Sequence, residues 1–182
     1  MVQFQHRKNI NVSEDGYLDI INMKTASLFS AACECGASFS DNGNGHRDSY
    51  SAFGENIGLA FQITDDLFDY LAVEEVIGKP TASDFADGKV TLPFITAFRN
   101  APETARRRVS DLFRSGFASR SDWSDVVLFV QDYGGIEYSL EKARGYGERA
   151  KDCLGGISPS PERDALHLAA DYVVDRIAPF SG

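Results

Sequence analysis

The sequence predicts an all-α fold on three observations. Helical segments can be recognised along the chain, and none of the chain is a convincing strand. Glycines and prolines punctuate the helical segments of the C-terminal half. No repeat, low-complexity tract or linker divides the 182 residues, of which 43% are hydrophobic. We therefore expect residues 1–182 to form a single all-helical domain.

The first helix is predicted to begin at Ser13. The Ser13 side chain can cap the helix, and Glu14 and Asp15 place negative charge in the first turn, where the helix dipole favours it. The helix continues through YLDIINMKTASLFSAACECGA and fades at residues 36–40. The composition of DNGNGH, residues 41–46, predicts a loop.

A second long helix is predicted at residues 49–72. The segment that follows, GKPTASDFADGKVTLP at residues 78–93, is too rich in Gly, Pro and Asp to be helical. Shorter helices are expected at residues 92–99, 102–115, 121–133, 135–153 and 159–178.

The charge distribution excludes several classes of protein. The net charge is −9, and the only basic run, Arg106-Arg107-Arg108, is short, which argues against nucleic-acid binding. No apolar stretch approaches the roughly 18 to 20 residues of a membrane span. The first residues, MVQFQHRKN, are too polar for a secretory signal, so a cytoplasmic location is the expectation.

The cysteines predict free thiols. Their number is odd, and no secretory signal accompanies them, which argues against a disulfide framework. Cys33 and Cys35 are two residues apart on a predicted helix, so they point to nearly opposite sides and cannot form a zinc clip. We interpret them, with Cys153, as buried free thiols.

The stretch FQITDDLFDY, residues 61–70, places three carboxylates in a helix that otherwise has the pattern of a buried one. At about 100° per residue, Gln62, Asp65, Asp66 and Asp69 fall within one arc of about 100°. The opposite and wider side is apolar and consists of Phe53, Ile57, Phe61, Ile63, Leu67, Phe68 and Leu71. Gly58 lies on the polar side and is expected to leave room there.

Two interpretations of this acidic face remain open. It could be a solvated surface, as a single aspartate on a helix usually is. However, no Lys or Arg follows at i+3 or i+4, and like charges this close repel one another. A divalent cation removes the conflict, and oxygen ligands favour Mg²⁺, which binds through one or two carboxylates and shares its shell with phosphates.

Lys24 raises a similar question on the first helix. It lies in the middle of an apolar stripe formed by Tyr17, Ile20, Ile21, Leu28, Ala31 and Cys35. Its stem could pack while the ammonium reaches solvent, or the cation could point into a cavity that holds an anion, with the Thr25 hydroxyl beside it. Segment 78–93 supplies two further cations, Lys79 and Lys89, with Asp84 and Asp87 between them. Together with the acidic face, these lysines are consistent with a phosphate site.

The sequence resembles a known family at these positions. IGLAFQITDDLFD, residues 57–69, is similar to the second aspartate-rich signature of the trans-isoprenyl diphosphate synthases, or polyprenyl synthetases. That signature reads apolar, Gly, two residues, aromatic, Gln, aliphatic, any residue, Asp, Asp, apolar, any residue, Asp. MKTASLF, residues 23–29, looks like the family's Lys-Thr helix, and GKPTASDFADGKVTLP looks like the loop after the second motif. The resemblance covers most of the chain.

The resemblance implies an isoprenoid-synthase-type helical bundle in which two aspartate-rich helices face each other across a cavity. It implies that Mg²⁺ binds the diphosphate of an allylic prenyl substrate, which ionises and condenses with isopentenyl diphosphate. Asp65 and Asp69 would be Mg²⁺ ligands, directly or through water, with Asp66 in support. The residues that would contact the allylic diphosphate or its metals are Lys24, Thr25, Gln62 and Lys79, and Lys89 would approach from the loop. The apolar cavity would keep water from the carbocation.

The resemblance also suggests a product class and a truncated bundle. GKVTLP looks more like the medium- and long-chain, octaprenyl-type synthases than the short-chain ones. Members carry a first aspartate-rich motif upstream of the Lys-Thr helix, whereas only 23 residues precede Lys24 here and none of them forms that motif. We expect the N-terminal part of the bundle to be missing and the chain alone to bind Mg²⁺-diphosphate weakly and not to turn over. Exposed apolar surface would favour a homodimer, as in the family, or pairing with a complementing piece.

Two other functions remain open from the sequence. A non-catalytic partner subunit of a larger synthase would explain the absent first motif, although the intact second signature argues against it. A different all-α Mg²⁺-diphosphate enzyme, such as a terpene cyclase, would use the same ionisation chemistry, but the Lys-Thr helix and the loop fit it poorly.

Overall fold

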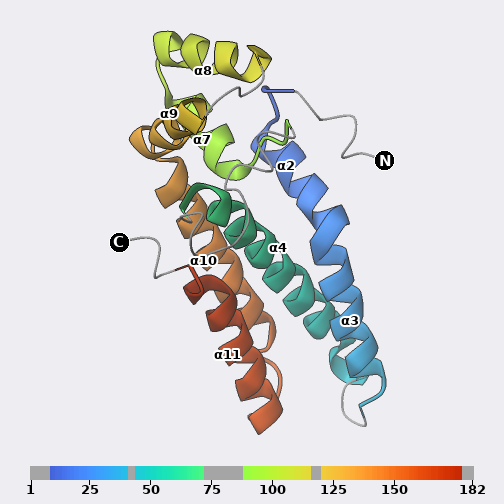
Figure 1. Ribbon diagram of the computed structural model, residues 1–182. Helices are drawn as coiled ribbons and strands as arrows, with labels where there is room; N and C mark the ends of the chain where they lie inside the picture. Colours follow the sequence, from blue (N-terminus) through green and yellow to red (C-terminus); the bar gives the residue numbers. More distant parts are fainter. Residues whose placement is uncertain (1–8, 41–43, 72–87, 116–119, 178–182) are drawn as a thin grey trace. The chain divides into compact units, whose positions relative to one another are not determined.

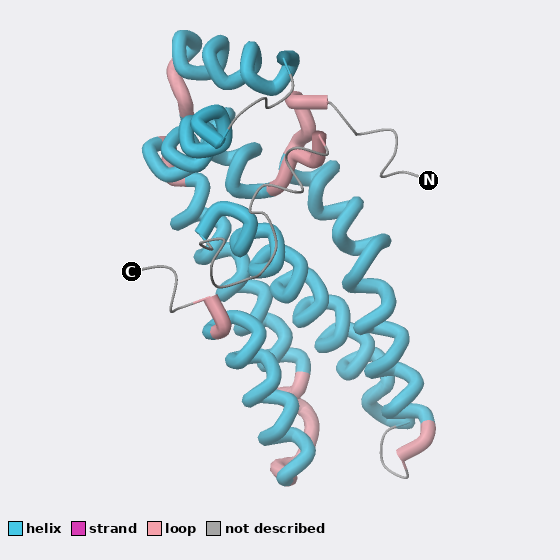
Figure 2. Tube along the Cα trace, viewed as in Figure 1, coloured by secondary structure: helices cyan, strands magenta, loops and turns pink. Residues whose placement is uncertain are grey.

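The computed structural model describes residues 9–40, 44–71, 88–115 and 120–177 (Figure 1). Within these ranges the chain forms helices joined by short turns and contains no strand (Figure 2). The predicted all-α fold is therefore confirmed for the described part of the chain. None of the described helices is long and apolar enough to cross a membrane.

The first predicted helix is a continuous helical run with an irregular centre. It consists of α2 (Glu14–Ile21), the π-helical turn η1 (Asn22–Ala26) and α3 (Ser27–Ser38). The Ser13 hydroxyl oxygen accepts a hydrogen bond from the Gly16 amide at 3.1 Å, which confirms the predicted cap. The π turn was not predicted; such turns interrupt α-helices and are frequent at functional sites.

The remaining helices begin and end within three residues of their predicted bounds. A 3₁₀ turn, η2 (Asn44–His46), leads directly into the long helix. The other helices are α4 (Arg47–Leu71), α7 (Leu92–Asn100), α8 (Glu103–Ser115), α9 (Arg120–Asp132), α10 (Gly135–Cys153) and α11 (Pro161–Asp175). Their ends follow local chemistry: Gly134 turns the chain after α9 at φ +72°, and the Ser160 side chain caps α11 through the Arg163 amide.

The chain divides into two compact units. One contains the described residues of Met1–Tyr17 and Asp65–Ser139, and the other contains those of Leu18–Thr64 and Leu140–Gly182. The divisions fall inside α2, α4 and α10, so each of these helices contributes to both units. The single domain expected from the sequence stays a prediction.

The unit that contains Leu18–Thr64 is built on long helices. α11 folds back along α10, and both pack on α4 (Figure 1). The shared core consists of Phe53, Ile57, Ala60, Ala150, Leu154, Ala170 and Val173. Cys33 and Cys153 pack against this core, whereas Cys35 is exposed. All three thiols are free, as predicted, but the expectation that Cys35 is buried is wrong because it faces away from the core.

The unit that contains Asp65–Ser139 has an aromatic core. The Phe94 ring of α7 is fully buried and lies 5.8 Å, between ring centroids, from Phe129 of α9. Gly135 begins α10 against α7: a Cβ there would lie 2.2 Å from the Pro93 carbonyl oxygen, so no side chain fits. Tyr70, near the end of α4, stacks on Trp123 of α9.

Candidate functional site

Two of the predicted site residues bind each other in the unit that contains Leu18–Thr64. The Thr25 hydroxyl donates a hydrogen bond of 2.7 Å to Oε1 of Gln62. Thr25 belongs to the π turn η1, and Gln62 belongs to α4, where it is only 5% exposed. Because the Gln62 oxygen is held by Thr25, the amide is oriented and its Nε2 donor group points away from Thr25. The Lys-Thr segment and the acidic helix thus meet at a partly buried polar contact.

Glycines let α3 and α4 approach closely enough for this contact. A Cβ on Gly58 would lie 2.6 Å from Cα of Ala26, and one on Gly54 would lie 2.5 Å from the Phe29 carbonyl oxygen. Neither position has space for a methyl group. The expectation that Gly58 leaves room on the polar face is therefore wrong: the backbone of Ala26, the residue after Thr25, occupies that room.

Lys24 is exposed, and its apolar neighbours divide into two groups. Tyr17 and Ile21, before the π turn, are each 3% exposed, whereas Leu28, after it, is 71% exposed. Ala31 and Cys35 are exposed as well. The π turn causes this difference because it changes the helical phase between the two groups. The side chain of Lys24 therefore lies at the surface, on the same side as the exposed group.

The second aspartate of the motif is buried and hydrogen-bonded in the other unit. The Tyr17 hydroxyl donates to Oδ2 of Asp66 at 2.7 Å, and the two residues are 3% and 5% exposed. Burial, and then the Asp66 carboxylate, raise the pKa of the Tyr17 phenol well above its ordinary value of 10.0. Tyr17 therefore stays protonated and keeps its proton available to the carboxylate.

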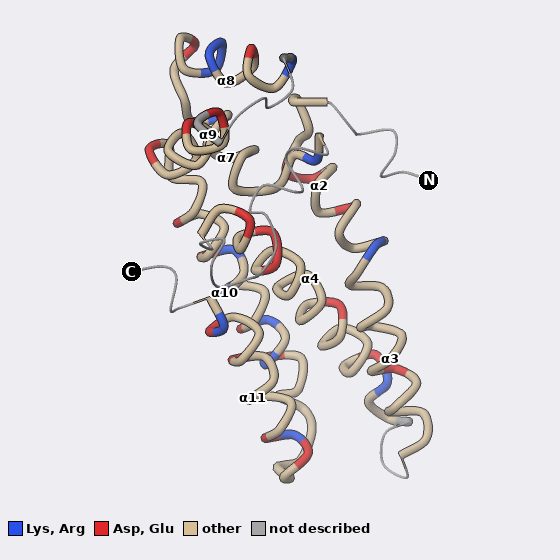
Figure 3. The backbone as a smooth tube through the Cα atoms, in the orientation of Figure 1, with Lys and Arg blue, Asp and Glu red and all other residues tan. Residues whose placement is uncertain are grey.

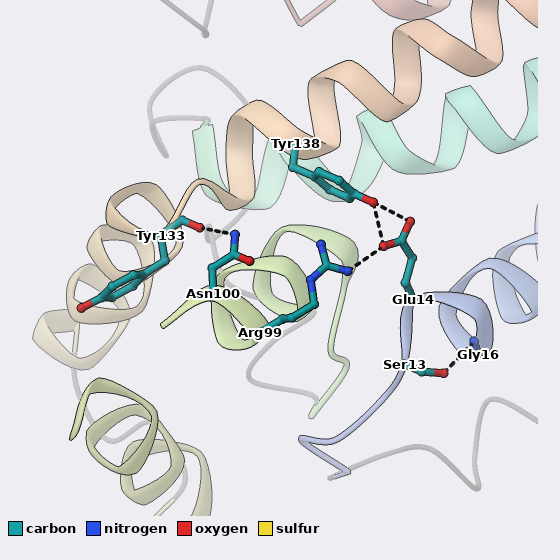
Figure 4. Close-up of polar contacts among 7 residues, drawn as sticks. All are labelled: Ser13, Glu14, Gly16, Arg99, Asn100, Tyr133 and Tyr138. Atoms are coloured by element: carbon teal, nitrogen blue, oxygen red, sulfur yellow. Dashed lines mark hydrogen bonds and ion pairs between the residues drawn. The ribbon is translucent and has the colours of Figure 1, made fainter. Parts of the chain in front are cut away.

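The beginning of α2, close to Tyr17, is fixed by a second polar cluster (Figure 4). The Tyr138 hydroxyl lies 2.8 Å from each carboxylate oxygen of Glu14, and Nη1 of Arg99 donates to the same carboxylate at 3.1 Å. The Arg99 guanidinium also lies over the Tyr138 ring at 5.2 Å. These contacts tie α2 to α7 and α10 within one unit. They place Tyr17 on a firmly held helix end.

The other two aspartates differ from Asp66 in exposure. Asp65 is exposed and Asp69 is half-buried. No group of three or more His, Cys, Asp or Glu side chains in the described ranges could hold a metal ion by itself. The three carboxylates are thus not a closed protein cage. An all-oxygen set with an exposed carboxylate still suits Mg²⁺, which binds through one or two carboxylates and retains water or phosphate ligands.

The end of the charged loop is anchored beside the motif. The Thr91 and Tyr70 hydroxyls form a buried hydrogen bond of 3.1 Å. Tyr70 follows Asp69 directly, and Lys89 is two residues before Thr91 and half-buried. Lys89 is therefore held on the segment that packs against the end of α4. Lys79, with most of segment 78–93, lies outside the described residues.

Tyr17 is a site residue that the sequence does not indicate, because its spacing from Lys24 assigns it only to the apolar stripe. A buried tyrosine hydroxyl needs a partner, and a carboxylate in an otherwise apolar helix needs a donor. These two requirements could have paired Tyr17 with an aspartate of the motif. They could not have selected Asp66, because the choice depends on the packing of residues 49 positions apart.

Comparison with known proteins identifies the family. The polyprenyl synthetase family model matches residues 1–129. The chain belongs to the polyprenyl synthetase family. It is 34% identical over 169 residues to the short chain isoprenyl diphosphate synthase of Methanothermobacter thermautotrophicus, covering 93% of this chain and 51% of that protein. It is also 34% identical over 179 residues to the all-trans-nonaprenyl-diphosphate synthase (geranyl-diphosphate specific) of Rhodobacter capsulatus, covering 97% of this chain and 54% of that protein.

Solved structures of polyprenyl synthetases share the fold. A decaprenyl diphosphate synthase from Rhodobacter capsulatus superposes with a TM-score of 0.87 at 34% identity, covering 97% of this chain and 54% of that one. A polyprenyl synthase from Caulobacter crescentus, complexed with calcium and isoprenyl diphosphate, gives a TM-score of 0.87 at 31% identity and covers 96% of this chain and 53% of that one. The predicted family and the isoprenoid-synthase-type fold are confirmed.

The family comparison does not decide the product class. The chain spans about half the length of the curated relatives it matches. Those relatives include both a short-chain and a nonaprenyl synthase at equal identity, so the preference for a medium or long product stays a prediction.

Proposed function

We propose that the chain provides the second-motif part of a trans-prenyltransferase site, which binds an allylic prenyl diphosphate for condensation with isopentenyl diphosphate. The observation that carries this proposal is the partly buried hydrogen bond between Thr25 and Gln62. It joins two family motifs 37 residues apart through side chains that the family resemblance assigns to the same substrate group. The long-chain product class belongs to the same proposal and rests on GKVTLP alone.

We propose distinct tasks for the three aspartates. Asp65, which is exposed, and Asp69 would hold Mg²⁺ through carboxylate oxygens, while Asp66 stays hydrogen-bonded to Tyr17 and fixes the helix between them. When bound, Mg²⁺ neutralises charge on the diphosphate and so stabilises it as a leaving group. This division agrees with the preference of Mg²⁺ for one or two carboxylates and leaves its other positions to water and phosphate oxygens.

The cationic and polar side chains would hold the diphosphate itself. Lys24 presents an exposed ammonium one residue before Thr25, and Gln62 presents the donor end of an oriented amide. Lys79 and Lys89 would reach the diphosphate from the loop. Each adds a positive charge or a hydrogen-bond donor to the group that departs with negative charge, which lowers the barrier to ionisation.

A complementation assay tests the proposal. The chain is mixed with the N-terminal part of a related synthase, and product is measured with isopentenyl and farnesyl diphosphates with and without Mg²⁺. We expect product only with both pieces and Mg²⁺, a loss of at least about 100-fold in Asp65→Ala, as for removal of a principal electrostatic group, and no turnover by the chain alone. Absence of product when both pieces are folded would contradict the proposal.

A partner-subunit role is the second candidate, because α3 exposes an uncharged face. Its exposed residues are Ser27, Leu28, Ala31, Ala32, Cys35 and Gly36, and Glu34 is its single charged residue (Figure 3). Such a face is typical of a contact surface. If this role holds, the chain will co-purify with a larger homologue whose activity is the same with wild type and Asp65→Ala.

A further inference from the structure

Arg176, the residue that follows α11, makes an unusual set of contacts with the middle of α4. Its Nη2 atom donates to the carbonyl oxygen of Phe61 at 2.9 Å and to Oγ1 of Thr64 at 2.8 Å, and Nε lies 3.3 Å from the same oxygen. The guanidinium also lies 4.2 Å above the Phe61 ring. All of these groups belong to one of the two compact units.

These contacts are specific to an arginine. The planar guanidinium reaches a backbone carbonyl, a hydroxyl and an aromatic face at once, whereas a lysine ammonium can satisfy only part of the set. Hydrogen bonds from a charged donor are stronger than those between neutral groups, and partial burial strengthens them further. The contacts therefore fix one turn of α4, residues 61–64, against the end of α11.

The same turn is held from its other side by α3. The Phe61 ring packs on Phe29 of α3 at 5.5 Å between centroids. Gln62, the next residue, has its amide oxygen on Thr25. The turn that carries Gln62 thus lies between two attachments, one from Arg176 and one from the segment containing Thr25.

We infer that Arg176 is a positioning residue for Gln62. It acts through the Phe61 carbonyl and the Thr64 hydroxyl to keep the Gln62 amide on Thr25. Where the proposed function holds, this keeps the amide donor directed for the diphosphate of the substrate. Neither sequence spacing nor the acidic motif indicates this role, since Arg176 and Thr64 are 112 residues apart.

Arg163, on α11, provides a matched control. It is half-buried like Arg176, and its Nη1 atom also donates to a backbone carbonyl, that of Ile157. That carbonyl belongs to the turn before α11 and not to α4. Removing either guanidinium deletes a charged hydrogen bond to a carbonyl, but only Arg176 touches the turn that carries Gln62.

The first readout needs no ligand. The side-chain amide signals of Gln62 are recorded by NMR on the full chain and assigned from their loss in Gln62→Leu. We expect Arg176→Met to shift or broaden them, Arg176→Lys to do so less, and Arg163→Met to leave them in place, each at a temperature where circular dichroism shows a folded chain. If Arg176→Met and Arg176→Lys leave the signals unchanged, or Arg163→Met moves them equally, the positioning role is wrong.

The second readout measures binding of inorganic diphosphate with Mg²⁺ by calorimetry. Arg176→Met should weaken binding about tenfold, the effect of one misplaced hydrogen bond, and Arg163→Met less than about twofold. Equal affinity of Arg176→Met and wild type would overturn the link to the substrate. If wild type binds no diphosphate even when mixed with the N-terminal part used for complementation, the proposed function fails, while the NMR comparison still decides whether Arg176 positions Gln62.

Discussion

Single side chains decide how the acidic motif is presented, and the buried pair of Tyr17 and Asp66 is the clearest case. Three aspartates that look alike in the sequence have three different surroundings: Asp65 is exposed, Asp69 is half-buried and Asp66 is buried on a tyrosine hydroxyl. A buried carboxylate is tolerated when a donor satisfies it. The pair therefore gives Asp66 a structural task that its neighbours do not share.

Tyr17→Phe removes the hydroxyl from this pair and retains the ring. We expect the free energy of unfolding at pH 7 to fall by about 1–3 kcal/mol, the cost of withdrawing a donor from a buried acceptor. Urea unfolding followed by circular dichroism measures the change. Tyr146→Phe is the matched control, because the Tyr146 ring packs on the core but its hydroxyl donates to no residue in the described ranges. An equal loss in both variants would contradict the assignment.

The same pair predicts a dependence of stability on alkaline pH. Burial and Asp66 raise the folded-state pKa of Tyr17 well above 10.0, while the unfolded phenol titrates near 10.0. The contribution of Tyr17 is therefore fully present below pH 10 and is lost as pH rises from there toward the folded-state pKa, by up to about 1.4 kcal/mol per pH unit. Unfolding free energies from pH 9 to 11 should fall more steeply in wild type than in Tyr17→Phe. Parallel curves would refute this.

At the scale of helices, close packing of α3 on α4 sets the geometry of the Thr25–Gln62 contact. Gly54 and Gly58 lie one turn apart on α4. Gly54 faces the backbone of α3 and Gly58 faces that of Ala26 in η1, and neither has room for a Cβ. The distance between the two helices is therefore fixed by the absence of side chains. A larger distance between the helices would therefore lengthen or break the hydrogen bond between Thr25 and Gln62.

Gly58→Ala should disturb this packing. The added methyl group would lie 2.6 Å from Cα of Ala26, and backbone cannot move aside as a flexible side chain can. We expect a loss of about 1–3 kcal/mol in unfolding free energy despite the better helix propensity of alanine. Gly36→Ala on α3 is the control, since nothing lies within 4 Å of a Cβ there, and it should be neutral or stabilising by up to about 1 kcal/mol. If Gly58→Ala has the same free energy of unfolding as wild type, the helices can move apart at no cost and the distance between them is not fixed by the glycines.

Helices and their ends could be predicted because their signals are local. Ser13 marked the beginning of α2, and the glycines and prolines of the C-terminal half marked helix ends to within three residues. The family signature placed Gln62 and the aspartates on one helix. The π turn at Lys24 and Thr25 could not be predicted, because MKTA has no composition that distinguishes it from a regular helix. The contacts of Tyr17 with Asp66 and of Arg176 with α4 depend on packing between distant segments, which spacing does not encode.

At the scale of the whole chain, α3 exposes a face that carries no charged side chain. Leu28 is 71% and Met23 is 56% exposed, while the link of such surface to absent helices stays a prediction. Net charge of −9 opposes association of like molecules, but α3 itself contributes a single charge. Association should therefore proceed through this helix.

Leu28→Gln should weaken self-association of the chain. Sedimentation velocity over a range of protein concentrations is expected to show that wild type associates and that the variant requires roughly tenfold more protein, as the loss of one buried leucine contact implies. Leu168→Gln is the control: Leu168 is 69% exposed, but Asp164 and Asp171 flank it on α11. Equal behaviour of both variants, or a monomeric wild type at all concentrations, would place the contact elsewhere.

The π turn η1 gives the first helical run one residue more than a regular helix needs to connect the same two ends. The run can therefore be shortened by one residue without being broken. Deleting Met23 would let η1 relax to an ordinary α-turn and leave α2 and α3 facing as they do now. Only side chains within the turn would change direction, whereas Phe29 would keep its packing on Phe61. A lineage that lost this one codon would therefore keep its fold, and a change in its diphosphate binding would come from the turn alone.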